Sequence, residues 1–163
     1  MRPRHLHRIL ATTGLHSGLG NAKGLIAGLD RARKSSLIVG CGDFFEGTGH
    51  HRLGGGSAER RMLAGAYDVI APGNHGWHHH VEPELHALTV CANVIDTAGK
   101  PLFRRLFLTT IGGRRVAVTA ILGFPAGPAN LPIPGRPLLS PRELDAPAGA
   151  FTFPADTTAR REE

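Results

Sequence analysis

The chain has 163 residues, of which 41% are hydrophobic and 20% charged, a composition that supports one domain with a hydrophobic core. Its formal net charge of +6 at pH 7 favours anionic partners such as phosphate-bearing ligands. The arginines are scattered, however, and no pattern of specific nucleic-acid binding is seen. Two cysteines exclude a disulfide-rich scaffold, and no apolar run approaches the length of a membrane span. No apolar stretch of a secretory signal follows Met1, so we expect a cytoplasmic protein with no membrane partner.

Strand and helix patterns alternate along the first part of the chain. Residues 5–13 are predicted to form a strand, and residues 21–34, with apolar side chains three and four apart, an amphipathic helix. The run 36–40 is apolar throughout, which is typical of a central parallel strand. The next predicted elements are a helix over 57–64, a strand over 67–71, a short helix over 82–88 and a strand over 89–95. This alternation predicts a parallel βαβ sheet, with Asn21 and Ser57 as helix N-caps.

The remaining segments are connections and a tail. Residues 42–56 are predicted to be a long glycine-rich loop, and the runs 103–110 and 114–122 flank Gly112-Gly113 in the pattern of a β-hairpin. Residues 124–163 contain eight prolines and no sustained periodicity. We therefore expect an ordered domain over 1–123 and a flexible proline-rich tail over 124–163. Both cysteines, Cys41 and Cys91, lie in or beside strand-like runs and are expected to be buried free thiols.

Polar side chains follow the predicted strands at their carboxyl ends. Asp43 comes after the strand 36–40, the pair Asn74-His75 comes after 67–71, and His16 lies in the loop after the first strand. In an open α/β sheet, sites form where the carboxyl ends of the strands meet. Aspartate, asparagine and histidine are also ligands of hard and borderline divalent metals. The sequence thus predicts a metal site for phosphate-ester hydrolysis at these loops.

The order of these loops resembles the calcineurin-like metallophosphoesterases, most closely their 5′-nucleotidase branch. Thr13-Gly-Leu-His16, Gly42-Asp-Phe-Phe-Glu-Gly47 and Gly73-Asn-His-Gly76 correspond to that family's Asp-x-His, Gly-Asp-x-x-x-Gly and Gly-Asn-His-Glu/Asp motifs. Cys91-Ala-Asn-Val94 is similar to its Ser-Ala-Asn-Val strand. The likeness covers roughly residues 6–123. It implies an α/β fold, an incomplete four-layer α/β/β/α sandwich, with a C-terminal hairpin.

The resemblance also implies roles for four residues. Asp43 would be the metal-bridging carboxylate, with Asn74 and His16 as further ligands, and His75 would stabilise or protonate the phosphoryl group. The cofactor would be one or two divalent ions, of manganese, zinc, iron, cobalt or nickel. The substrate would be a nucleotide or another phosphomonoester, and a separate C-terminal domain supplies the substrate pocket in the 5′-nucleotidase branch. Taken singly, Asp43 could instead be a loop or cap residue, Asn74 a turn residue and the histidines structural.

Three departures from the family pattern leave other functions open. Gly14 stands where the first motif has its aspartate, and Gly76 stands where an acid would orient the histidine. No histidine follows His86, so the family's later histidine ligands have no counterpart. The chain could therefore be a degenerate, non-catalytic relative that binds a nucleotide, a metal or a partner. It could also be a half-enzyme whose missing histidines come from a partner chain.

Two histidine runs and two loop residues complete the candidates. The preferred interpretation of both histidine runs, His50-His51 and His78-His79-His80, is a surface run that binds divalent metals incidentally. The alternatives are recruitment into the site and no role. Glu46 and Trp77 are expected to serve loop packing rather than chemistry.

Overall fold

A computed structural model describes residues 4–47, 49–94, 96 and 100–122, apart from the side chains at positions 49, 50 and 77. The predicted tail over 124–163 lies outside the described residues, and so do the side chains of His50 and Trp77. The elements are β1 (Arg8–Thr12), η1 (Leu19–Asn21), α1 (Ala22–Arg33), β2 (Ser36–Cys41), α2 (Gly49–Gly54), α3 (Ser57–Ala66), β3 (Val69–Ala71), η2 (Trp77–Val81), α4 (Pro83–His86), β4 (Phe107–Ile111) and β5 (Arg114–Val118).

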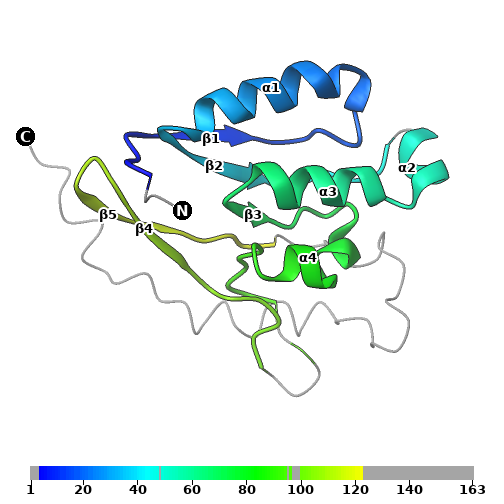
Figure 1. The fold of residues 1–163 in the computed structure, drawn as a ribbon. Helices are drawn as coiled ribbons and strands as arrows, with labels where there is room; N and C mark the ends of the chain where they lie inside the picture. The colour runs from blue at the N-terminus through cyan, green and yellow to red at the C-terminus, as the bar shows by residue number, and fades with distance from the viewer. Residues whose placement is uncertain (1–3, 48, 95, 97–99, 123–163) are drawn as a thin grey trace, which may run out of the picture.

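The first three strands form a parallel sheet in the order β1-β2-β3, and helices connect them (Figure 1). Strand β2 is central, and it is buried from Ser36 to Gly40, as its continuous apolar sequence predicts. The register pairs Ile9 with Leu37 and Val39 with Val69. The predicted parallel βαβ core is therefore confirmed.

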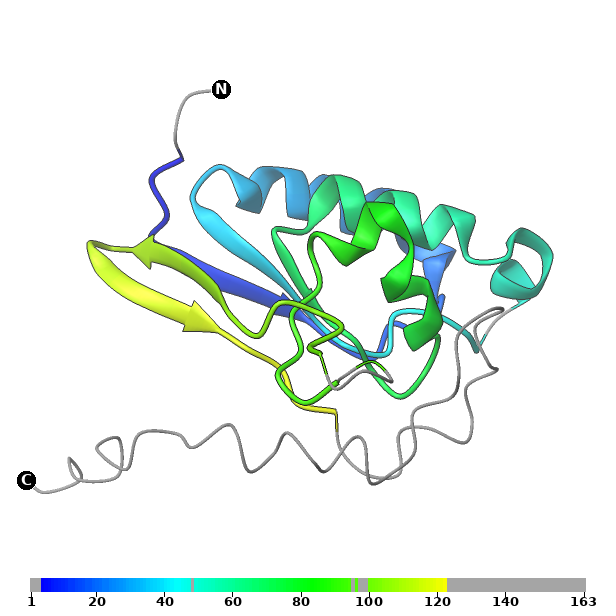
Figure 2. The same cartoon turned by 90° about the horizontal axis from the view of Figure 1, so that it is seen from below.

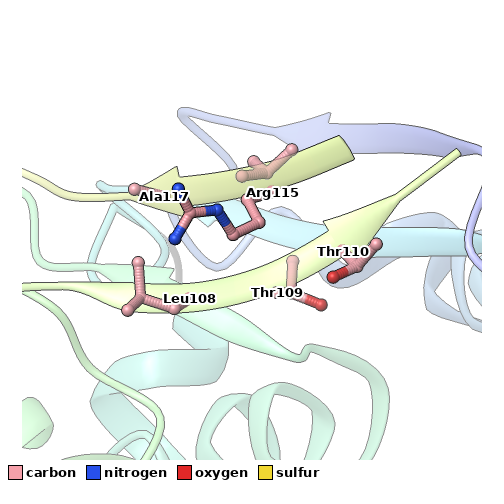
Figure 3. Close-up of a pocket in the computed structure, with 6 residues that line it drawn as sticks. Leu108, Thr109, Thr110, Arg115 and Ala117 are labelled. Carbon is pink, nitrogen blue, oxygen red and sulfur yellow. The ribbon is translucent and has the colours of Figure 1, made fainter. Parts of the chain in front are cut away.

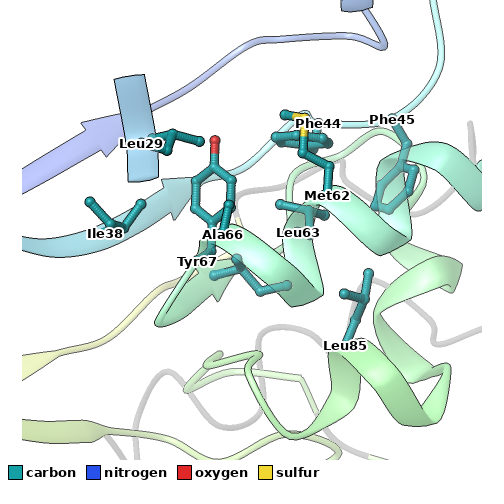
Figure 4. Packing of buried hydrophobic residues seen from close by; sticks show 10 residues of the cluster. Leu29, Ile38, Phe44, Phe45, Met62, Leu63, Ala66, Tyr67 and Leu85 are labelled. Carbon is teal, nitrogen blue, oxygen red and sulfur yellow. The ribbon is translucent and has the colours of Figure 1, made fainter. Parts of the chain in front are cut away.

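The two faces of this sheet are covered by different layers. Ile38 of β2 points to the helical side, where it joins Leu29 of α1, Leu63 of α3 and Tyr67 in one buried cluster (Figure 4). Leu37 and Val39 belong to a second cluster, which includes side chains of β4 and β5. This division follows from the alternation of side chains along a strand. The helices and the hairpin thus lie on opposite sides of the parallel strands (Figure 2).

Strands β4 and β5 form the predicted antiparallel hairpin around Gly112-Gly113. Phe107 pairs with Val118 and Ile111 with Arg114. Phe107, Ile111 and Val118 pack against the Leu37 side of the parallel sheet. The helices, the parallel sheet and the hairpin form three successive layers. This arrangement confirms the predicted mixed α/β class and fits an incomplete four-layer sandwich.

The predicted strand over 89–95 is wrong as a continuous strand. Within the described residues, isolated bridges join Thr89 to Ile70 and Val90 to Arg104, and residue 95 lies outside the description. Asn93 binds the end of the hairpin instead, because its Nδ2 donates to the carbonyl of Leu122 at 2.8 Å and its Oδ1 accepts from the Leu122 N–H at 3.0 Å. The backbone of the segment bonds to a different partner at each step, since the N–H groups of Val90, Cys91 and Ala92 donate to the carbonyls of Ile70, Arg104 and Ala120. It therefore forms no continuous ladder with one neighbouring strand.

Asn21 occupies the N-cap position of α1 as predicted, although its side chain makes no cap hydrogen bond. The predicted cap at Ser57 is wrong, because Gly56 occupies the N-cap position of α3. The prediction of a loop over 42–56 is wrong at residues 49–54, which form helix α2. The side chain of Leu53 in this helix is 92% exposed. None of the helices in the described part of the chain is both long and apolar enough to cross a bilayer.

The two cysteines differ in their surroundings. Both are free, but Cys41 is exposed and Cys91 is buried. The prediction of two buried thiols is thus wrong for Cys41, which is the last residue of β2 and lies where the strand leaves the core.

Candidate metal centre

The loops that follow β1 and β2 run side by side. The N–H of Gly14 donates to the carbonyl of Gly42 at 3.2 Å, and the N–H of His16 donates to the carbonyl of Asp43 at 2.9 Å. These bonds continue the pairing of β1 with β2 past the ends of the strands. They bring the backbone of His16 next to that of Asp43, as the position of both residues at carboxyl strand ends predicts.

The loops that follow β2 and β3 touch at Gly73. The N–H of His75 donates to Oδ1 of Asp43 at 3.1 Å. A Cβ atom at Gly73 would lie 1.9 Å from Oδ1 of Asp43 and 2.2 Å from its backbone nitrogen. Only glycine leaves room for this approach, which places the Asp43 carboxylate against the loop that carries Asn74 and His75.

We expect Gly73→Ala to destabilise the protein by about 1–3 kcal/mol, the usual cost of overpacking, because the added methyl group must displace Asp43. Urea unfolding measures the change. Gly28→Ala in α1 is the matched control, since a Cβ there meets no atom within 4 Å and alanine is the better helix former, so this variant should be more stable by about 0.5–1 kcal/mol. Equal stability of Gly73→Ala and wild type would show that the two loops are not in contact.

The side-chain amide of Asn74 lies against the Asp43 carboxylate. With Nδ2 facing Asp43, the amide donates to both carboxylate oxygens at 3.2 Å, and its Oδ1 accepts from Nε2 of His75 at 3.2 Å. In the opposite orientation the amide oxygen faces the two carboxylate oxygens, an arrangement that needs a cation to offset the repulsion of the three oxygens. The amide can therefore serve as a hydrogen-bond donor or, after turning over, as an oxygen ligand.

The imidazole of His75 is held from two sides. Its Nδ1 lies 3.2 Å from Oε2 of Glu46, and its ring meets the ring of His16 edge-on, with centroids 4.8 Å apart and an angle of 77° between the planes. The contact with Glu46 differs from the sequence-based expectation that Glu46 serves loop packing. The four predicted site residues thus form one group, to which the structure adds Glu46.

The backbone of the first two loops is strained. Among the described residues, four that are not glycine have positive φ angles: His16 (44°), Ser17 (55°), Asp43 (52°) and Glu46 (65°). Such residues are uncommon and cluster at functional sites, where the surrounding structure enforces a costly conformation. Here all four lie in the loops after β1 and β2, which supports a functional role for this part of the molecule.

The donor atoms of the group suit one divalent cation. Asp43 offers carboxylate oxygens and Asn74 an amide oxygen, both ligands of hard cations, and the imidazole of His16 lies in the same group. No three His, Cys, Asp or Glu side chains are grouped to hold a metal ion anywhere in the described ranges. Among the described side chains, the adjacent oxygens of Asp43 and Asn74 are the ones that could hold such a cation, with water as its other ligands.

The histidine run after β3 does not lie on the surface. His79 is 6% exposed and His80 2%, so the expected surface run is wrong for both. A guanidinium can only donate, so the contact of Arg60 with Nδ1 of His79 at 3.1 Å leaves the proton of His79 on Nε2. That atom lies 3.0 Å from Nε2 of His51, which then accepts. Both ring nitrogens of His79 are used within the protein.

The buried histidines are held in the neutral form. Burial lowers the pKa of His79 to about 3, with smaller contributions from the charges of His78, Arg60 and neighbouring histidines. Burial also lowers the pKa of His80 to about 3. The hydroxyl of Thr89 donates to the carbonyl of Leu85 at 2.8 Å, so it accepts from Nδ1 of His80 at 3.0 Å. These side chains are part of the core rather than of the metal centre.

A groove of about 450 Å³ lies on the hairpin, away from the strand tips (Figure 3). Its lining residues are Leu108, Thr109, Thr110, Arg115, Val116 and Ala117. None of them belongs to the candidate metal centre.

Helices cover one face of the parallel sheet and a β-hairpin packs on the other. Solved structures share this α/β fold. A 5′-nucleotidase precursor from Thermus thermophilus aligns with a TM-score of 0.63 and 24% identity over 86% of this chain. NAD nucleotidase from Haemophilus influenzae aligns with a TM-score of 0.59 and 21% identity over 72% of this chain.

These alignments show the fold, and they also show that the chain spans only part of the length of each neighbour. The chain covers 33% of the Thermus protein and 26% of the Haemophilus protein, about a third of their length or less. No family model matches the sequence, and no curated protein matches it. The predicted resemblance to the 5′-nucleotidase branch is thus confirmed for the fold.

Proposed function

We propose that this chain is a metal-dependent phosphoester hydrolase that acts on phosphate monoesters, nucleotides among them. The observation that carries the proposal is the contact between the Asn74 amide and the Asp43 carboxylate, at 3.2 Å to both oxygens, beside the His75 imidazole. The two structural neighbours named above are a 5′-nucleotidase precursor and an NAD nucleotidase, which supports a nucleotide substrate. The net charge of +6 favours an anionic one.

Each residue of the centre has a role in this proposal. Asp43 and Asn74 hold one divalent cation, of manganese, zinc, iron, cobalt or nickel, and His16 is the third ligand. When bound, such a cation lowers the pKa of a water molecule and offsets the charge of the phosphoryl group. His75, whose Nδ1 faces Glu46, presents Nε2 to the phosphate, and with a hydrogen on both ring nitrogens Nε2 would donate a hydrogen bond or a proton to it.

A direct assay tests the proposal. The purified chain with manganese, cobalt or zinc should release phosphate from a nucleoside 5′-monophosphate or from an aryl phosphate, and a chelator should abolish the release. Absence of turnover with every metal and both substrates would reject catalysis by this chain.

The second candidate function is binding without catalysis, either by a degenerate relative or by a half-enzyme. It is favoured by the short donor set at the strand tips, since no three His, Cys, Asp or Glu side chains are grouped in the described part of the chain. Calorimetry that detects binding of a nucleotide or a metal without turnover would support the degenerate relative. Turnover that starts only when a second, histidine-bearing chain is added would support the half-enzyme.

Gly14→Asp tests the assignment of the first loop by a gain of function. Gly14 has φ of +60°, a conformation that aspartate tolerates better than most residues, and a Cβ there meets no atom within 4 Å. A carboxylate at this position adds a charged ligand, so we expect manganese to bind at least about tenfold more tightly, worth about 1.4 kcal/mol. Calorimetric titration measures the change, and unchanged affinity would place Gly14 away from the cation.

A further inference from the structure

Glu46 links the loop after β2 to the loop after β3. Its Oε2 lies 3.2 Å from Nδ1 of His75, and the two side chains are 30% and 39% exposed, respectively. Glu46 has φ of +65°, a conformation that a residue with a side chain adopts at an energetic cost. The loop thus holds Glu46 in a strained backbone conformation in which its carboxylate reaches the histidine.

The contact selects one form of the imidazole. A carboxylate has only acceptor oxygens, so Nδ1 of His75 must carry the hydrogen that joins it to Glu46. In the neutral ring Nε2 then has no hydrogen, so it cannot also donate to Oδ1 of Asn74. The charged carboxylate is the stronger acceptor of the two, and Nε2 instead accepts from Nδ2 of Asn74, 3.2 Å away, when the amide oxygen faces Asp43. The edge-on contact with His16 restrains the plane of the same ring. Glu46 therefore controls which nitrogen of His75 is available at the metal centre.

The position directly after His75 cannot carry such a carboxylate. Gly76 has φ of +59°, and a Cβ there would lie 2.4 Å from Cβ of Phe45. Phe45 is fully buried and cannot move aside without disturbing the core. An acid that orients His75 is consequently excluded from position 76, and Glu46 is the carboxylate that the structure places on Nδ1.

We propose that Glu46 is a positioning residue for His75, which holds the imidazole in the Nδ1–H form with Nε2 directed toward Asn74. The catalytic meaning of this role rests on the proposed function, but the role itself does not. It acts through His75 and needs no contact between Glu46 and substrate or cation.

The test is nitrogen NMR of the His75 ring in the metal-free protein at pH 8, with the signals assigned by comparison with His75→Gln. In wild type we expect the Nδ1–H form to dominate. In Glu46→Ala the ratio of Nδ1–H to Nε2–H should fall at least about tenfold, the factor that corresponds to a hydrogen bond with a charged group. Glu46→Gln keeps the shape of the side chain and removes its charge, so it should shift the ratio in the same direction and serves if Glu46→Ala fails to fold.

The matched control is Glu84→Gln, which removes an exposed carboxylate from α4 and should leave the ratio unchanged. A ratio in both Glu46 variants equal to that of Glu84→Gln would overturn the proposal. The phosphatase assay separates this result from the proposed function. If wild type is active, the Glu46 variants should lose about tenfold in kcat with little change in KM. If wild type is inactive but the ratio responds to Glu46, the positioning role stands and the hydrolase assignment fails.

Discussion

Asp43→Asn is expected to lower the rate of metal-dependent phosphate release at least about a hundredfold, which corresponds to about 2.7 kcal/mol of transition-state stabilisation. The change removes the charge that holds the cation but little else. Asparagine has nearly the same shape, its Oδ1 can still accept the N–H of His75 that Asp43 accepts at 3.1 Å, and it tolerates the φ of 52° at this position. The protein should therefore keep its fold and lose its activity.

The matched control is Asp30→Asn on the exposed side of α1. This variant removes the same charge from the same residue type away from the strand tips, so it should keep the wild-type rate. Circular dichroism and urea unfolding of both variants exclude a general loss of structure. A wild-type rate in Asp43→Asn would reject Asp43 as the residue on which the metal chemistry depends.

Acidification from pH 6.5 to 5 is expected to destabilise the fold by several kcal/mol. The pKa values of His79 and His80 are lowered to about 3 in the folded chain, whereas an unfolded histidine has a pKa near 6.5. As the pH falls, the unfolded state binds protons first, so stability is full above the unfolded pKa and is lost progressively below it. Each histidine contributes about 1.4 kcal/mol per pH unit in this window, or about 2 kcal/mol between pH 6.5 and 5.

Urea unfolding at a series of pH values measures this loss. His80→Gln should flatten the dependence of the unfolding free energy on pH, while His7→Gln, a change at an exposed histidine, should leave the slope as in wild type. Because His80 bonds Thr89 inside the core, its replacement also lowers the unfolding free energy at pH 7.5. This loss is separate from the change in slope of the unfolding free energy against pH, which is the quantity under test. A slope that is identical in all three proteins would mean that the histidine run is solvated.

The sheet and the strand tips could be predicted because their signals are local. The run from Ser36 to Gly40 is apolar, and each polar tip residue follows such a run beside a glycine. Parallel strands have their carboxyl ends on one edge, so Asp43, Asn74 and His16 were expected to lie together. The hairpin follows in the same way from two strand-like runs around Gly112-Gly113.

The features that the sequence did not predict depend on contacts between distant residues. Glu46 contacts His75 with a positive φ angle at Glu46, which no local sequence pattern predicts. The burial of His79 depends on Arg60 and His51, which come from α3 and α2. The segment that holds Asn93 forms no continuous strand because its backbone bonds to several distant segments in turn, and Asn93 itself bonds Leu122.

Manganese binding to the purified chain, followed by electron paramagnetic resonance of the free ion, tests most directly whether the strand tips form a cation site. The contacts of Asp43 and Asn74 predict one bound ion per chain in wild type and in Asp30→Asn, and none at the same concentrations in Asp43→Asn. An Asp43→Asn variant that binds manganese as wild type does, or a wild-type chain that binds none, would contradict a metal centre at the meeting point of these loops.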